Sequence, residues 1–128
     1  MMGRGVRIRR RLAAAAVIVL LGFLAVWLQD RAIHQGTYCL QDERTILLDV
    51  AGGPATWTRI GSVVESADSV VIEVRELRAP LPGTGGEVRW LTVRLGEPLG
   101  SRAVIDASTG LQMVLARAIC EFAPSPAG

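Results

Sequence analysis

Apolar and polar residues alternate with period two along much of the chain after position 45. In the first such run Ile46, Leu48 and Val50 fall on one face, and Gly52-Gly53-Pro54 ends the alternation. Similar runs, each closed by turn residues, follow at 56–65, 70–77, 87–95, 104–106 and 111–115. About five to seven short strands at such spacing are typical of a small antiparallel β-sandwich or barrel-like domain. The pattern therefore predicts a mainly-β fold.

Turn residues indicate how some of these strands are connected. The turn 66–69 joins the runs on either side of it and predicts a hairpin. The loop 107–110 predicts a second hairpin, and its final residue, Gly110, suits a left-handed position. Composition at 111–119 is also compatible with a short helix that carries Cys120 to the sheet.

The first part of the chain has a different pattern. Seventeen consecutive uncharged residues run from Leu12 to Leu28, and nearly all of them are apolar. At about 1.5 Å per residue, a helix of this length is just sufficient to span the hydrocarbon core of a bilayer. Residues 12–28 are therefore predicted to be a transmembrane signal anchor.

The charges beside this run predict its orientation. Nothing equally basic follows it closely, so the positive-inside bias makes residues 1–11 a cytoplasmic stub of a single-pass cell-membrane protein, with the rest extracytoplasmic. A cleaved signal peptide, leaving a secreted soluble domain, is the alternative. The run is longer than most such segments, and no Ala-x-Ala-like pair follows it. The arginines that predict the orientation are Arg4, Arg7, Arg9, Arg10 and Arg11.

Composition divides the remainder into three parts. Residues 29–38 are polar and aperiodic and are predicted to be a juxtamembrane tether. The extracytoplasmic β domain is expected at 39–122, interrupted by a loop at 79–86 with two prolines and three glycines. The tail 123–128 is expected to be disordered.

Charge and cysteine content narrow the function classes. After position 28 there are nine arginines and all twelve acidic residues, a net charge of −3, which gives nucleic-acid binding no support. The sequence has no lysine, which excludes a P-loop, a Schiff base and a Ser-x-x-Lys nucleophile.

In an oxidising compartment Cys39 and Cys120 are predicted to form a disulfide that stabilises the fold by roughly 4 kcal/mol. Two free thiols or an intermolecular bridge are the alternatives.

The segment from Val88 to Gly110 reads VRWLTVRLGEPLGSRAVIDASTG. It resembles a pattern found in uncharacterised small exported or membrane-anchored proteins of actinobacteria, in which a strand leads into a P-L-G-x-R-x-V-x-D turn. The resemblance implies export and no catalytic role. In this segment Pro98 and Gly100 shape a turn, while Arg102 and Asp106 are expected to bind turn backbone or to pair with another residue.

Candidate chemistry is sparse. Two distant cysteines and one histidine do not make a metal site, and no cofactor is predicted. His34 lies in the predicted tether without an evident orienting partner and is expected to be solvated. A carboxylate pair such as Glu73 with Asp106, brought together by strand pairing, is what a hydrolase would need, but solvated surface is the expected role. We therefore expect a protein that is not an enzyme.

The predicted function is that of an accessory or protein-interaction module that contacts another envelope or membrane protein. Trp57, Trp90 and Arg94 are the candidate interaction residues, because Trp90 shares a strand face with Thr92 and Arg94. The alternative is an envelope-glycan or small-ligand site built from Trp90 and the Pro80–Gly86 loop.

Overall fold

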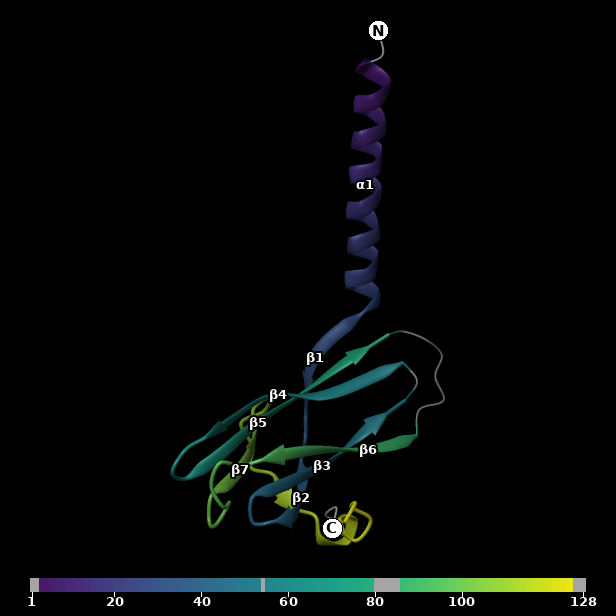
Figure 1. Ribbon diagram of the computed structural model, residues 1–128. Coiled ribbons are helices and arrows are strands. Elements are labelled where there is room, and N and C mark those ends of the chain that lie inside the picture. Colours follow the sequence, from purple (N-terminus) through teal and green to yellow (C-terminus); the bar gives the residue numbers. More distant parts are fainter. Residues whose placement is uncertain (1–2, 54, 80–85, 126–128) are drawn as a thin grey trace.

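The computed structural model describes residues 3–53, 55–79 and 86–125, which form one long helix and a β domain below it (Figure 1). The helices are α1 (Gly3–Trp27) and α2 (Arg117–Cys120). The strands are β1 (Gln29–Ile33), β2 (Thr37–Asp42), β3 (Thr45–Gly52), β4 (Thr56–Glu65), β5 (Ser69–Arg78), β6 (Glu87–Arg94), β7 (Ala103–Asp106) and β8 (Val114–Leu115).

The strands form two four-stranded sheets, which confirms the mainly-β prediction. One sheet has the order β1-β5-β4, with β7 also paired to β5; the other has the order β6-β3-β2-β8. Most pairs are antiparallel, but β7 runs parallel to β5 and β8 runs parallel to β2. The expectation of a purely antiparallel fold is thus corrected, because the last two strands each return to a sheet through a crossover.

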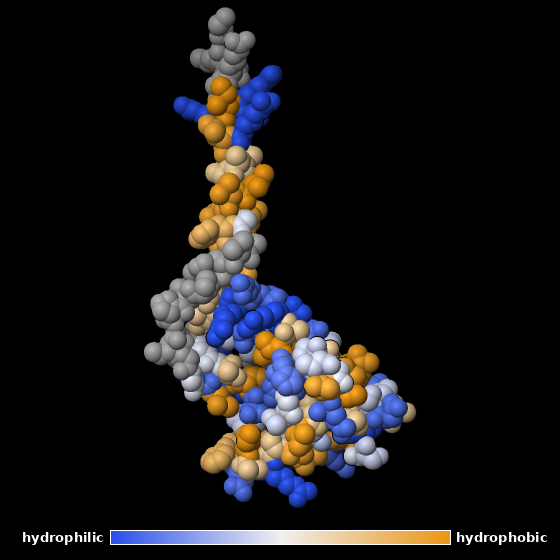
Figure 2. All heavy atoms as spheres, turned by 180° about the vertical axis from the view of Figure 1, so that it is seen from behind, coloured by the Kyte–Doolittle hydropathy of each residue, from blue (hydrophilic) through white to orange (hydrophobic). Residues whose placement is uncertain are grey.

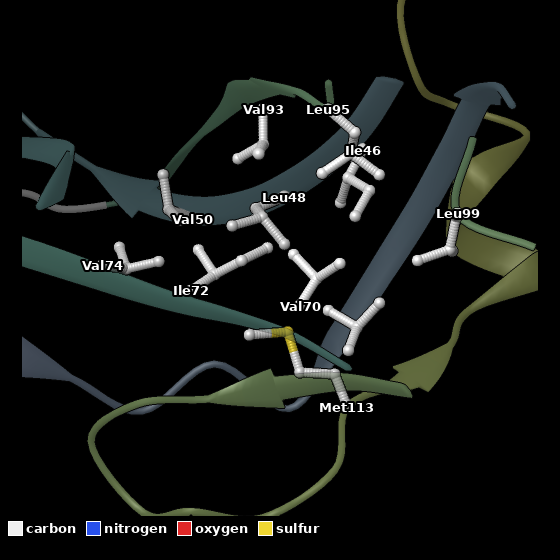
Figure 3. Packing of buried hydrophobic residues seen from close by; sticks show 11 residues of the cluster. Ile46, Leu48, Val50, Val70, Ile72, Val74, Val93, Leu95, Leu99 and Met113 are labelled. Atoms are coloured by element: carbon white, nitrogen blue, oxygen red, sulfur yellow. The ribbon is translucent and has the colours of Figure 1, made fainter. Parts of the chain in front are cut away.

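The core lies between the two sheets and follows the period-two pattern. β3 contributes Ile46, Leu48 and Val50, which are the residues that alternation placed on one face. Figure 3 shows these side chains meeting those of β5 from the opposite sheet. The remaining buried members of the cluster are Val70, Ile72, Val74, Val93, Leu95, Leu99, Val104 and Met113. Burial of apolar area on these inner faces is the main force that holds the sheets together.

The two predicted hairpins are realised to different extents. β4 and β5 pair along their whole length, with a bulge between Ile60 and Ser62. The second hairpin turns at Gly110, whose φ of +72° is the left-handed conformation expected there. Beyond it only the bridge between Ile105 and Gln112 forms, and the chain then leaves to build β8 and α2. The segment 111–119 thus contains both a short strand and the start of a short helix, so the strand and helix interpretations each hold in part.

The predicted disulfide is confirmed. Cys39 on β2 and Cys120 at the end of α2 are bonded, with their Cα atoms 5.5 Å apart. The disulfide joins β2 to α2 and so closes a loop that contains nearly the whole β domain. Just beyond it, the amide of Gln41 donates to the carbonyl of Pro124 at 3.0 Å. Residues 123–125 of the predicted disordered tail thus belong to the described chain, whereas 126–128 lie outside it.

The segment 29–38, predicted as a tether, instead forms β1, a crossover and the first residues of β2. β1 pairs with β5, and β2 pairs with β3, so residues 34–36 carry the chain from one sheet to the other. The physical reason is that β1 lies at a sheet edge, where most of its side chains are exposed. An edge strand needs no apolar alternation, so its sequence looks like that of a polar linker.

α1 begins well before the predicted span and contains the arginines as well as the apolar run. Within the residues that the structure describes, no helix combines enough length with enough apolar character to cross a membrane. The predicted transmembrane span at 12–28 is therefore not supported, because the charged first third of α1 leaves only a short uncharged remainder. Most of the predicted 79–86 loop also lies outside the described residues.

Candidate functional site

The strands β1 and β7 lie end to end along the same side of β5. Ile33, the last residue of β1, pairs with Val74, and Asp106, the last residue of β7, pairs with Ile72. The two strands run toward each other, so the residues that follow them meet. As a result His34 Nδ1 lies 2.8 Å from Asp106 Oδ2, although 72 positions separate the two residues.

Asp106 is completely buried and accepts hydrogen bonds on both carboxylate oxygens. The backbone N–H of Ser108 and that of Gln35 donate to it at 3.0 and 3.2 Å. The hydroxyl of Ser108 donates at 2.9 Å to Oδ2, and that of Thr109 at 3.1 Å to the same oxygen. We call His34, Gln35, Asp106, Ser108 and Thr109 the Asp106 cluster.

These contacts determine the charge of the cluster. Burial raises the pKa of Asp106, but the hydrogen bonds from His34, Ser108 and Gln35 together outweigh it and leave the pKa below its ordinary value. Asp106 is therefore ionised at neutral pH. Since a carboxylate only accepts, His34 must donate from Nδ1, which leaves Nε2 facing away from the carboxylate.

The geometry differs from that of a catalytic triad. In a triad the serine hydroxyl binds the histidine nitrogen that is remote from the carboxylate. Here the Ser108 hydroxyl donates to the carboxylate itself, on Oδ1 at 3.0 Å and on Oδ2 at 2.9 Å. Among the described residues, no group of three His, Cys, Asp or Glu side chains is placed to hold a metal ion. What the cluster does is order the backbone around the junction of β1 and β7, because the carboxylate binds the backbone N–H groups of Gln35 and Ser108.

Gln35 extends this ordering to the other sheet. Its backbone N–H binds Asp106, while its side-chain amide donates to the carbonyls of Thr37 and Asp49 at 2.9 and 3.0 Å. Asp49 belongs to β3 in the second sheet, so one buried residue in the crossover connects both sheets. Burial of Gln35 carries little penalty because the side-chain amide is hydrogen bonded.

The predicted interaction residues are divided between the two sheets. Trp57 lies on β4, is 49% exposed, and faces away from the core in the first sheet. Trp90 and Arg94 lie on β6 in the second sheet, where Trp90 is half-buried opposite Asp49 and Arg94 is exposed. Since the outer faces of a sandwich point in opposite directions, Trp57 and Trp90 are separated by the core. The proposed glycan site at Trp90 stays a prediction, and the loop that would complete it lies mostly outside the described residues.

The suggested carboxylate pair is not formed. Asp106 faces the interior, whereas Glu73 lies on the outer side of β5 and pairs with Arg75 at 3.3 Å. Strand pairing does bring the two residues near each other, because Asp106 pairs with Ile72, but Glu73 is the next residue and neighbouring positions on a strand point to opposite faces.

Arg102 fulfils both expectations for it. Its guanidinium donates to the carbonyls of Glu97 and Pro98, both at 2.9 Å, and pairs with Glu65 at 3.2 Å. Glu65 in turn accepts from the backbone N–H of Gly96, which together with Arg102 lowers the pKa of Glu65. Arg102 and Glu65 together hold the turn after β6 against the β4–β5 hairpin.

Asp106 binds turn backbone through the N–H of Ser108, as the sequence predicted, but the rest of the cluster was missed. His34 was expected to be solvated without an orienting partner, and it pairs with Asp106 instead. A signal for the buried carboxylate exists in the sequence. Val104 and Asp106 share one face of the predicted strand, so the alternation already placed a carboxylate toward the core. A charged residue at an inward position requires several hydrogen-bond donors. Ser108 and Thr109, two and three residues later, are typical of such a turn.

Comparison with known proteins adds no assignment: no family model, no curated protein and no solved structure matches the chain.

Proposed function

We propose that the chain is an accessory, protein-interaction module whose β domain is held at a membrane by α1. The observation that carries this proposal is the exposure of α1. Its large apolar side chains extend into solvent rather than packing on the β domain, as Figure 2 illustrates. Those exposed by more than half of their area are Ile8, Leu12, Val17, Ile18, Val19, Leu20, Leu21 and Phe23. A contiguous apolar surface of this kind needs lipid or protein to cover it.

The junction between α1 and the β domain supports the same proposal. Leu28 alone separates α1 from β1, and its N–H still donates to the carbonyl of Leu24 at 2.8 Å. If α1 lies in the cell membrane with its arginines on the cytoplasmic side, as the sequence predicts, the β domain begins immediately outside the membrane. Such placement suits a module that meets another membrane or envelope protein.

The surface that we assign to the partner is the free edge of β4. In the described chain this ten-residue strand pairs with one strand only, β5, and its other edge is bridged only at Thr56, to Gly53. It carries two exposed apolar residues, Trp57 and Val64, the latter 60% exposed. An open strand edge offers unpaired N–H and C=O groups to which an extended segment of a partner can pair.

A photo-crosslinking amino acid tests the assignment in the full-length chain in cells. Placed at Val64, it should give one discrete adduct with a membrane or envelope protein. The matched control is Val114 on β8, which is 65% exposed at the far edge of the other sheet and should give none. Equal adducts at both positions, or none at Val64, would rule out β4 as the partner-binding edge.

A further inference from the structure

Two arginines at the junction of α1 and the β domain converge on one buried carboxylate. Glu76 Oε1 lies 3.8 Å from Arg31 Nη2 and 3.9 Å from Arg78 Nε. Both distances are too long for hydrogen bonds, and among the described residues Oε1 has no hydrogen-bond partner. The Glu76 side chain is 10% exposed, whereas those of Arg31 and Arg78 are 58% and 59% exposed. Both arginine side chains thus approach the same carboxylate oxygen while more than half of their surface stays exposed.

Strand register places both arginines close to the base of α1. Arg78 is the Cα partner of Gln29, the first residue of β1, and Arg31 is the partner of Glu76. Paired Cα atoms lie about 5 Å apart. Arg78 therefore lies beside Gln29, which is two residues after the end of α1. If α1 is embedded in lipid, Arg78 lies beside the membrane surface and Arg31 two residues further along β1, so both side chains can extend toward the headgroups, whose field acts over roughly 8 Å at physiological salt.

The surrounding charges favour an anion at this position. Arg59 and Arg75 are paired with Asp30, at 2.8 and 3.4 Å, and are less available. Arg31, Arg78 and Glu76 together carry one positive charge. The opposite end of the β domain is acidic; there the hairpin turns and the turn after β6 carry Asp42, Glu43, Glu65, Asp68 and Glu97 against Arg44, Arg94 and Arg102. The domain is therefore polarised, with its basic end beside α1, where Figure 2 shows strongly hydrophilic residues directly below the helix.

We infer that Arg31 and Arg78 bind the phosphate of an anionic phospholipid in the membrane that holds α1. Guanidinium groups match phosphate oxygens through paired N–H donors, and two of them converging on one point can hold a single phosphate. The contact would orient the β domain on the bilayer and so fix which edge faces a partner. This inference rests on the proposed function, because it requires α1 to be in lipid.

The test uses the full-length chain in nanodiscs of phosphatidylcholine alone or with phosphatidylglycerol. The Nε–H NMR signals of Arg31 and Arg78, identified from R31Q and R78Q, should shift as the phosphatidylglycerol fraction rises. Each single substitution should weaken the apparent lipid affinity about fivefold, the effect of one basic residue near an anionic surface. The matched control, R94Q with R117Q, removes two exposed charges elsewhere and should leave the affinity unchanged.

Three results would overturn the inference. Unshifted arginine signals while the chain co-elutes with the discs would leave α1 in lipid but remove the headgroup contact. Equal shifts from inorganic phosphate added to phosphatidylcholine discs would make the site one for free phosphate rather than for lipid. A chain that does not co-elute with discs of either composition would overturn the proposed function and this inference with it.

Discussion

Replacing Asp106 by alanine should cost about 4 kcal/mol of unfolding free energy. The carboxylate is completely buried and accepts from His34, from two backbone N–H groups and from two hydroxyls. A hydrogen bond to a charged group is worth about 1.5–3 kcal/mol, but bonds that share one acceptor are not additive. The substitution also leaves the N–H of Gln35 buried without its acceptor. Loss of one partner from a buried charged network costs about 3–5 kcal/mol, which sets the estimate.

Thermal unfolding of the full-length chain in a neutral detergent measures this cost. Near-UV circular dichroism follows the tryptophans Trp57 and Trp90 in the β domain, and a loss of about 4 kcal/mol should lower Tm by roughly 20 °C in a domain of this size.

The pH dependence of the unfolding free energy provides a second test. Because the pKa of Asp106 is lowered in the folded protein, its contribution is complete above the unfolded pKa of about 4 and is lost as pH falls through the folded value. D106A should lack this part of the acid sensitivity.

Asp68 provides the matched control. It lies in the exposed β4–β5 turn and accepts the Ser66 hydroxyl at 3.0 Å, so D68A should cost about 0.5 kcal/mol or less. If D106A unfolds within about 1 kcal/mol of D68A, the Asp106 cluster does not hold the junction of β1 and β7, and the reasoning fails.

Three further predictions concern other parts of the β domain. Replacing Cys39 and Cys120 together by serine should lower the unfolding free energy by about 4 kcal/mol, seen as a Tm drop that reduction of the natural chain reproduces. R102Q should cost about 2–3 kcal/mol in urea titration, because its carbonyl and Glu65 contacts are lost, whereas R94Q at an exposed position should change stability by less than about 0.5 kcal/mol. G110A should cost about 1 kcal/mol by the same titration, since φ is +72° there; an unchanged midpoint would show that the turn relaxes.

Residues buried on one face of a strand were predictable from the sequence alone. The inward residues of β3 and β5 follow the alternation because these strands each have one face in the core, although Leu47 on the other face of β3 is buried as well. The disulfide was predictable as well, since both cysteines belong to a region expected to lie in an oxidising compartment. These features depend on local periodicity or on chemistry that needs no knowledge of strand order.

Features that depend on strand order were not predictable. β1 lies at the edge of its sheet, so most of its residues face solvent and carry little apolar signal, and the parallel pairing of the short strand β8 with β2 has no local signal. The contact between His34 and Asp106 arises only because β1 and β7 share one side of β5. Likewise, the pair Arg31 and Arg78 exists only through strand register. Their sequence positions, 47 apart, give no indication of it.

The central proposal is that α1 holds a disulfide-linked β domain at a membrane. The intact mass of the protein recovered from carbonate-washed membranes, before and after reduction and alkylation, tests it most directly. We predict a full-length mass of 13.7 kDa in the membrane fraction, with two alkyl groups taken up only after reduction. Recovery in the soluble fraction with a mass lacking the apolar run, or alkylation without reduction, would contradict the account.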